Sequence, residues 1–298
     1  MPSTVSGLPS TSPTLLVIVG PTASGKSALA LKTAKEFDGE IIAADSRTVY
    51  RGMDIGTAKP TKDDQAKVKH WGLDLVEPGQ RFTAYQFKSY AQNAVSDVQK
   101  RGKLPILVGG TGLYIDSLIF DFGFRQDVDQ AKRKKLEAMN IEALQDFIRE
   151  MSLPMPFNFK NRRHLIRTVE TKGQAGSRKH RLPKGVILVG IMPADKVLKK
   201  RIDRRIENWF SDGLIDETEK LLRNYGEKVL KTTGGIGYGL MVDYLNERTT
   251  VDEAKENFKK EHWQYARRQK TWFKGNKFIH WFESPEQAYS YIKSRLNT

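Results

Sequence analysis

The chain has 298 residues, no cysteine, and 50 Lys and Arg against 35 Asp and Glu, which gives a formal net charge of +15. This length suffices for one large or two modest domains, and a chain without cysteine can form no disulfide, thiolate metal site or cysteine nucleophile. The positive surplus is concentrated after residue 130 and favours a polyanionic partner such as a nucleic acid.

The N-terminal residues 1–13 are rich in Ser, Thr and Pro and have neither the basic head nor the apolar stretch of a signal peptide. We expect a disordered leader there. The longest apolar run, residues 15–20, is much shorter than a membrane span. These features predict a cytoplasmic enzyme that does not associate with membranes.

Short apolar runs alternate with amphipathic stretches in the first part of the chain, which predicts buried parallel strands joined by helices. The expected strands cover residues 15–19, 39–45, 103–110 and 185–193. Between 121 and 177 strand signals give way to short charged helices, and helical patterns also fill the chain after 193. The predicted fold class is therefore α/β: a P-loop NTPase-like parallel sheet with flanking helices over 14–120 and 178–298, a helical insertion over 121–177, and a helical C-terminal region.

A phosphate-binding loop follows the first expected strand. Its residues fit the pattern G-x-x-x-x-G-K-[ST] between a strand and a helix, and they are Gly20, Pro21, Thr22, Ala23, Ser24, Gly25, Lys26 and Ser27. Glycines let backbone N–H groups close on phosphate oxygens, and the following helix adds its positive end. Lys26 would neutralise a distal phosphate and Ser27 would hold Mg²⁺.

A P-loop alone indicates nucleotide or phosphate binding and leaves the reaction open. Nucleotide hydrolases and kinases also place an aspartate at the end of a second strand to hold the metal. The strand over 103–110 ends instead in Gly109 and Gly110, whereas the strand over 39–45 ends in Asp45. Asp45 faces the expected ligand crevice, where it could be a metal ligand, a general base, or a structural cap of the next turn.

Several segments, in order, resemble the tRNA dimethylallyltransferases, also called tRNA isopentenyltransferases, of the bacterial type. They are GPTASGKSALA (20–30), ADSRTVYRGMDIGTAKP (44–60), LVGGTGLYIDSL (107–118), RRHLIRTVE (162–170), RIDRRIENWFSDGLIDE (201–217), IGY (236–238) and RRQKTWFK (267–274). The resemblance spans about residues 15–280. It implies transfer of a dimethylallyl group from dimethylallyl diphosphate to N6 of adenosine 37, beside the tRNA anticodon, by a monomeric enzyme with Mg²⁺.

The resemblance also implies roles for individual residues. Asp45 matches the catalytic base, Thr22 matches a P-loop threonine that positions the amine or the diphosphate, and Arg201 and Arg205 would add charge at the diphosphate. The residues that match tRNA-contacting segments or lie in basic clusters are Asp45, Ser46, Arg47, Thr48, Thr111, Arg133, Arg163, His164, Leu165, Ile166, Arg167, Arg268 and Gln269. The insertion would grip the anticodon stem.

Some positions depart from the family pattern. Gly239 and Leu240 stand where relatives carry a charged or amide side chain after GY, and the loop before RRHLIRTVE is the unusual LPMPFNFKNRR. The insertion is therefore expected to grip tRNA somewhat differently. The C-terminal aromatic residues Trp263, Tyr265 and Trp272 are expected to pack in the core.

Two other functions remain open at this point. The protein could act on a free nucleotide, as a small-molecule kinase or an adenylate isopentenyltransferase, although a small acceptor does not require basic clusters along an insertion. It could also be a noncatalytic RNA-binding protein that retains a relic P-loop.

Overall fold

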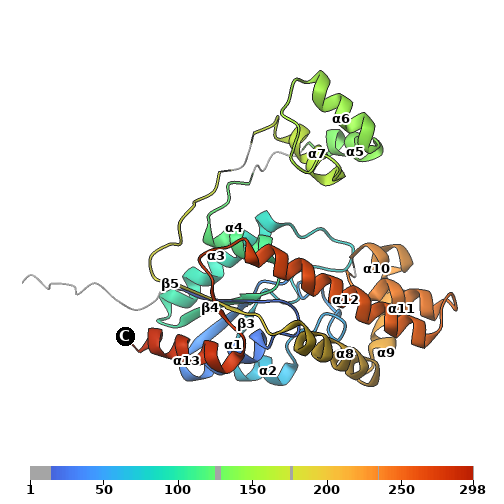
Figure 1. The fold of residues 1–298 in the computed structure, drawn as a ribbon. Coiled ribbons are helices and arrows are strands. Elements are labelled where there is room, and N and C mark those ends of the chain that lie inside the picture. The colour runs from blue at the N-terminus through green and yellow to red at the C-terminus, as the bar shows by residue number, and fades with distance from the viewer. Residues whose placement is uncertain (1–14, 125–128, 175–176, 234, 298) are drawn as a thin grey trace, which may run out of the picture. The chain divides into compact units, whose positions relative to one another are not determined.

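The computed structural model describes residues 15–124, 129–174, 177–233 and 235–297, so the leader expected over 1–13 lies outside the described part. The chain forms two compact units (Figure 1). The larger unit contains the chain up to Ile119 and from Leu182 onward, and the smaller unit is Phe120–Arg181.

A six-stranded sheet organises the larger unit, with the order β3-β2-β4-β1-β5-β6 and all pairs parallel. The strands are β1 Leu15–Val19, β2 Gly39–Ala43, β3 His70–Trp71, β4 Leu104–Gly109, β5 Val186–Ile191 and β6 His280–Phe282. The predicted α/β class with a parallel sheet is confirmed. The edge strands β3 and β6 were not predicted because two or three residues are too short for a periodic pattern.

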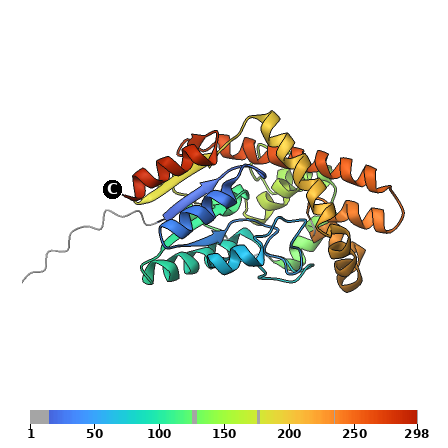
Figure 2. The same ribbon diagram turned by 90° about the horizontal axis from the view of Figure 1, so that it is seen from below.

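Helices cover both faces of this sheet. In the larger unit they are α1 Lys26–Glu36, α2 Lys62–Lys67, α3 Ala84–Lys100, α4 Gly112–Ile119, α8 Asp195–Ser211, α9 Leu214–Tyr225, α10 Glu227–Thr233, α11 Tyr238–Leu245, α12 Val251–Lys274 and α13 Pro285–Leu296. Helices α1 and α13 lie on the same face of the sheet (Figure 2), and their residues Leu29 and Ile292 belong to one buried cluster. Helices α3 and α4 pack on the other face, so the central strands are buried on both sides and carry near-continuous apolar runs.

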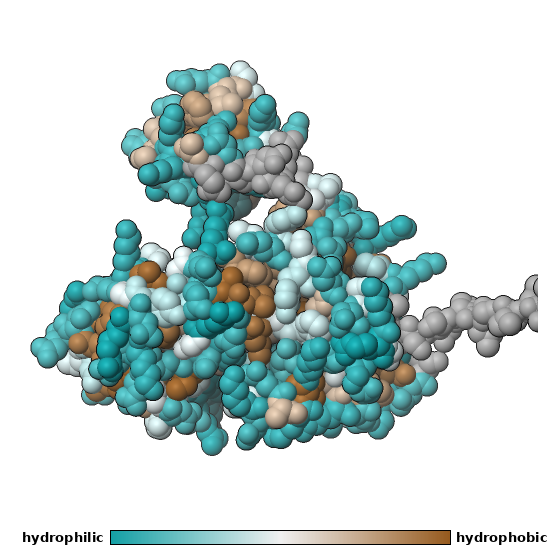
Figure 3. Space-filling model, turned by 180° about the vertical axis from the view of Figure 1, so that it is seen from behind, coloured by the Kyte–Doolittle hydropathy of each residue, from teal (hydrophilic) through white to brown (hydrophobic). Residues whose placement is uncertain are grey.

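A second core joins the helices after β5 to the P-loop residue Ala23 and to the loop after β2, which contributes Val49, Tyr50 and Met53. Its members include Ile206 and Trp209 from α8, Tyr238 from α11 and Phe258 from α12. The face of the protein in Figure 3 is mostly hydrophilic, with apolar residues gathered near the middle of the larger unit. This core fixes α8 and α12, the two helices that carry Arg201, Arg205 and Gln269 to the P-loop.

The smaller unit consists of α5 Gln130–Ala138, α6 Ile141–Glu150 and α7 Arg162–Glu170. Each helix begins directly after a residue whose side chain accepts a backbone N–H of the first turn, namely Asp129, Asn140 and Asn161. The apolar stripes of the helices close on a small core: Leu136, Leu144, Ile148, Leu165, Ile166 and Val169. The helical insertion expected from the sequence is therefore present as a fold element.

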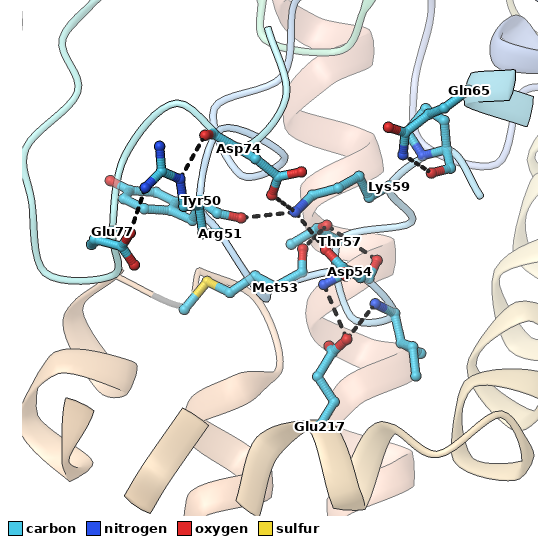
Figure 4. A network of polar contacts seen from close by, with 12 residues as sticks. Tyr50, Arg51, Met53, Asp54, Thr57, Lys59, Gln65, Asp74, Glu77 and Glu217 are labelled. Atoms are coloured by element: carbon cyan, nitrogen blue, oxygen red, sulfur yellow. Dashed lines mark hydrogen bonds and ion pairs between the residues drawn. The ribbon is translucent and has the colours of Figure 1, made fainter. Parts of the chain in front are cut away.

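The loop between β2 and α2 is fixed by the contacts of two charged side chains, Lys59 and Glu217 (Figure 4). Lys59, whose side chain is only 2% exposed, places its ammonium 2.5 Å from Asp54 Oδ1 and 2.6 Å from Asp74 Oδ1. The carboxylate of Glu217 accepts the backbone N–H groups of Asp54 and Ile55 at 3.0 and 2.9 Å. The loop that follows Asp45 is thus tied to α9.

Replacing Lys59 with methionine is expected to lower the free energy of unfolding by about 1.5–3 kcal/mol, because two carboxylates lose a charged hydrogen-bond donor. The cost stays below that of a fully buried pair because Asp54 and Asp74 are partly open to water. Urea unfolding measures the change, with Lys62→Met, at an exposed position of α2, as the control. Equal midpoints for the two variants would show that the network does not stabilise the fold.

Candidate active site

The predicted phosphate loop connects the end of β1 to the start of α1. Gly20 and Gly25 adopt φ values of 155° and 98°, and Gly25 lies in the region that favours glycine. A Cβ on Gly20 would lie 2.5 Å from the backbone oxygen of Ile191, so the loop passes close to the end of β5. The first-turn N–H groups of α1 have no partner within the helix, which makes this end an anion site.

Lys26 lies within this loop and donates from Nζ to the backbone oxygen of Pro21 at 3.1 Å. Desolvation lowers the pKa of Lys26 to about 8, with Asp45 opposing the shift and Arg205 adding to it. The carboxylate of Asp45 and the guanidinium of Arg205 therefore act on the same ammonium. A cation of lowered pKa in a loop of backbone donors is suited to a multiply charged phosphate ligand.

Two arginines of α8 reach the loop from one face of the helix. Arg205 donates to Thr22 Oγ1 at 3.1 Å, and Arg201 donates to the backbone oxygen of Ser24 at 3.2 Å. Burial lowers the pKa of Arg205, which still leaves the guanidinium charged at neutral pH. The structure thus brings together Lys26, Arg201 and Arg205, which the sequence predicted as one anion-binding group.

Gln269 of α12 bridges the phosphate loop and the end of β4. Its Oε1 accepts the backbone N–H of Thr22 at 2.8 Å, and its Nε2 donates to the backbone oxygen of Gly110 at 3.0 Å. A Cβ on Gly110 would lie 2.1 Å from that amide nitrogen, so glycine is needed for the approach. The side chain is buried, and in this arrangement Gln269 contacts the loop rather than the surface. Sequence reasoning missed this bridge, although the Gly109-Gly110 pair signals a close approach.

Asp45 follows β2 at the carboxyl edge of the sheet. Its Oδ1 accepts the backbone N–H of Arg47 at 2.8 Å, and the backbone N–H of Ser46 donates to Thr111 Oγ1 at 3.0 Å. Thr111 in turn donates its backbone N–H to the oxygen of Ala44 at 3.2 Å. Asp45 and Ser46 therefore lie in one turn, which Thr111 contacts from the end of β4. The charge of Asp45 acts on Lys26, so this turn lies next to the phosphate loop.

Tyr265 belongs to this site, and sequence reasoning placed it in the core. Burial and the nearby charge of Asp45 raise the pKa of the Tyr265 phenol, which also contacts the hydroxyl of Thr111. Its side chain is half-buried. A neutral phenol beside a carboxylate is a hydrogen-bond donor for a polar ligand.

Arg47 is held by the segment that precedes α11. Arg47 donates to the backbone oxygen of Thr233 at 2.8 Å, and a Cβ on Gly235 would lie 2.5 Å from its Nε. Thr48 is buried. The composition of the glycine-rich segment before α11 suggests a simple turn. Its Gly235 also leaves the space that the side chain of Arg47 occupies.

Arg268 and Trp272 lie on the exposed face of α12. Trp272 is 47% exposed and its indole donates to Asp116 at 2.8 Å, so the expectation that it packs in the core is wrong. A surface groove of about 470 Å³ runs along this face, lined by Gln264, Arg267, Arg268, Thr271 and Trp272. Exposed arginines and an indole on one face can contact RNA.

In the smaller unit the predicted residues divide between surface and core. Arg163 and His164 are exposed and the side chain of Arg167 is 43% exposed, whereas Leu165 and Ile166 pack in the core of the unit. Arg133 pairs with Glu170 and Glu137, both at 2.8 Å. The surface of α7 is therefore basic, and its two apolar residues support the helix from inside.

Neither a metal cluster nor a membrane span is found in the part of the chain that the structure describes. It contains no group of three or more His, Cys, Asp or Glu side chains able to hold a metal ion. None of its helices is long and apolar enough to cross a membrane. The hydroxyl of Ser27, exposed at the start of α1, is the P-loop ligand available to a metal bound by phosphate.

A family model described as IPP transferase matches residues 48–276. The tRNA dimethylallyltransferases of Acetivibrio thermocellus and Staphylococcus carnosus are 37% and 35% identical to this chain; the alignments cover 95% of it in each case and 97% and 95% of those proteins. The full-length tRNA isopentenylpyrophosphate transferase of Bacillus halodurans superimposes with a TM-score of 0.71 at 32% identity, covering 95% and 96% of the two chains. A eukaryotic dimethylallyltransferase acting on tRNA shares the fold, with a TM-score of 0.77 at 22% identity over 94% of this chain and 76% of that one.

Proposed function

The chain belongs to the IPP transferase family, and on that basis we propose that it transfers a dimethylallyl group from dimethylallyl diphosphate to N6 of adenosine 37 in tRNA. The products are N6-isopentenyladenosine and diphosphate. The bond between the donor carbon and the diphosphate oxygen breaks, the bond to N6 forms, and N6 loses a proton.

The observation that carries this proposal is the convergence of three cations on a P-loop that lies beside Asp45. Lys26, Arg201 and Arg205 all donate to atoms of residues 21–24, and the charge of Asp45 acts on Lys26. Negative charge grows on the diphosphate as the prenyl group leaves, and prearranged donors aimed at developing charge lower the barrier. The loop thus holds a leaving group.

Asp45 is the proposed general base. An exocyclic adenine amine is a poor nucleophile because its lone pair is delocalised into the ring, so its proton must be taken as the new bond forms. The hydrogen bond from the Arg47 backbone holds the carboxylate at the edge of the sheet. Thr22, whose hydroxyl accepts from Arg205, lies in the loop where it can position the amine or the diphosphate.

Mg²⁺ fits the donors present. Mg²⁺ binds through few protein ligands together with substrate phosphates and water, so a site without a carboxylate cluster suits it. Ser27 would hold the ion together with the diphosphate, and Asp45 is the nearby carboxylate that the sheet offers. The ion would neutralise the departing diphosphate.

We propose that both units bind tRNA. Adenosine 37 is stacked in the anticodon loop, so it must be drawn out of the stack before N6 reaches Asp45. Asp45 to Thr48, Thr111 and Arg268 would contact the extruded region, with Gln269 acting through the P-loop. Residues 121–177, with Arg133 and Arg163 to Arg167, would grip the anticodon stem as one tRNA-binding domain. Because tRNA is the proposed substrate, we propose a cytoplasmic location. We propose further that the enzyme acts as a monomer.

An enzyme that prenylates free AMP is the second candidate, since it would use the same loop and the same base. Incubation with labelled dimethylallyl diphosphate and either AMP or unmodified tRNA separates the two. We expect label in tRNA and none in AMP. Label in AMP alone would replace the present proposal, and label in neither would remove prenyl transfer altogether.

The affinity for the donor is expected to decrease as pH rises through about 8, the pKa of Lys26 in the free protein. Below that value Lys26 is charged and attracts the diphosphate; above it the amine is neutral and binding must also take up a proton. The expected decline approaches about tenfold per pH unit. Calorimetry between pH 7 and 9.5 measures it, and Lys26→Ala should show a weaker, flat profile. A flat wild-type profile would mean that Lys26 does not titrate on binding.

A further inference from the structure

The loop between α6 and α7 presents aromatic side chains to solvent. Phe157 is 96% exposed, Phe159 46% and Met155 36%. Single exposed apolar residues are common on protein surfaces, but several in one short loop form a patch that signals a binding surface. Because Phe157 contributes almost nothing to the core of the small unit, its role must lie outside the fold.

The loop backbone is ordered by hydrogen bonds at several points. Gln145 of α6 donates from Nε2 to the oxygen of Phe159 at 2.8 Å, and the backbone N–H of Asn161 donates to the oxygen of Asn158 at 2.8 Å. Asn161 then caps α7 by accepting the Arg163 N–H at 3.0 Å. These bonds order the backbone directly after Phe157, which reduces the entropy lost when a partner binds.

The chain segment that carries these rings is cationic. Between Leu153 and His164 the sequence has Lys160, Arg162 and Arg163 and no carboxylate. Lys160 and Arg163 are exposed and form no ion pair with any residue that the structure describes, while Arg162 donates to the backbone oxygen of Glu137. The patch therefore suits a partner that offers both negative charge and a flat apolar face.

An unstacked nucleobase in a single-stranded segment of RNA has this combination. Its face stacks on aromatic rings, while the phosphates on either side attract Lys and Arg. A base within a paired stem has no free face. A protein partner would be expected to meet charges of both signs at the rim of such a patch.

We propose that Phe157 is a stacking platform for an unpaired nucleobase of the tRNA substrate, with Lys160 and Arg163 on the adjoining phosphates. The inference rests on the proposed tRNA specificity and adds to it a binding residue on the smaller unit.

The test compares Phe157→Ala and Phe157→Trp with wild type in binding to unmodified tRNA. Stacking contributes about 1–3 kcal/mol per base, so Phe157→Ala should weaken binding by about 5- to 150-fold and Phe157→Trp should restore it. Folding is not at risk because the ring is almost fully exposed. Val197→Ala, at a 43% exposed position of α8 in the larger unit, is the matched control and should bind normally.

Salt dependence separates stacking from charge. Phe157→Ala should leave the slope of log affinity against log salt unchanged, whereas Arg163→Gln should reduce it by about 0.7–0.9 for one lost phosphate contact. In a second experiment, single loop nucleotides of the tRNA are replaced with abasic residues. At the position that stacks on Phe157, the replacement should weaken binding by the wild-type protein and leave the affinity of Phe157→Ala unchanged.

Wild-type affinity in Phe157→Ala, or losses that add with every abasic position, would overturn the inference. Neither result affects the proposed function, because donor transfer to tRNA by the wild-type protein is measured separately. Loss of transfer in the wild type would instead point to failure of the proposed function. Dimethylallyl diphosphate affinity should be the same in all these variants.

Discussion

Replacing Asp45 with asparagine is expected to lower kcat for prenyl transfer by about 10²- to 10⁴-fold, the range that a general base contributes. Asparagine keeps the shape of the side chain and can still accept the Arg47 N–H that Asp45 accepts at 2.8 Å. It cannot take a proton from the adenine amine. Affinity for tRNA should therefore stay within a few-fold of wild type while turnover falls.

Single-turnover measurement with saturating donor separates chemistry from binding in this variant. Asp252→Asn, an exposed aspartate in the first turn of α12, controls for loss of one negative charge. A decline of less than about fivefold in Asp45→Asn would mean that another group, or water, takes the proton. A noncatalytic RNA-binding protein would show no turnover before or after the change.

Replacing Lys26 with alanine is expected to lower kcat/KM by about 10²- to 10³-fold, as for removal of one donor from a site of developing charge. Lys26 is bonded to the oxygen of Pro21 and lies in the same loop that Arg201 and Arg205 contact. The two arginines remain, so the site keeps part of its positive charge. Donor affinity should fall along with the rate.

Lys35→Ala, at an exposed position of the same helix, is the control and should behave as wild type. Thermal unfolding of Lys26→Ala should be nearly unchanged, because the lysine is held by one backbone contact in the loop. Full activity of Lys26→Ala would show that the loop does not hold the diphosphate. Lost activity with unchanged donor affinity would mean that Lys26 stabilises only the transition state and does not contribute to donor binding.

The fold class was predictable because its central strands are buried on both faces and therefore carry continuous apolar runs. The edge strands could not be found in this way: β3 and β6 have two and three residues, and tertiary pairing alone defines them. The helical insertion was visible because strand signals between 121 and 177 give way to short charged helical patterns.

The candidate site was predicted where local sequence determines local geometry. Gly20, Gly25 and Lys26 form a loop by short-range rules, and the structure places them at the end of β1 as expected. Gln269, which bridges Thr22 and Gly110, is 247 positions from Thr22 and 159 from Gly110 in the sequence, and no local pattern encodes such contacts. Tyr265 and Trp272 could not be placed for the same reason. Helical spacing shows that both lie on α12, but which faces of α12 are covered depends on contacts with distant parts of the chain.

The position of the transferred prenyl group distinguishes the proposed function from its alternatives. Purified protein is incubated with dimethylallyl diphosphate, Mg²⁺ and unmodified tRNA, and the digested product is mapped by mass spectrometry, with tRNA carrying guanosine at position 37 as the matched acceptor control. We expect one dimethylallyl group on N6 of adenosine 37, release of diphosphate, and no product from the control tRNA. A prenyl group on another nucleotide, or none on tRNA under conditions that bind both substrates, would contradict the proposed function.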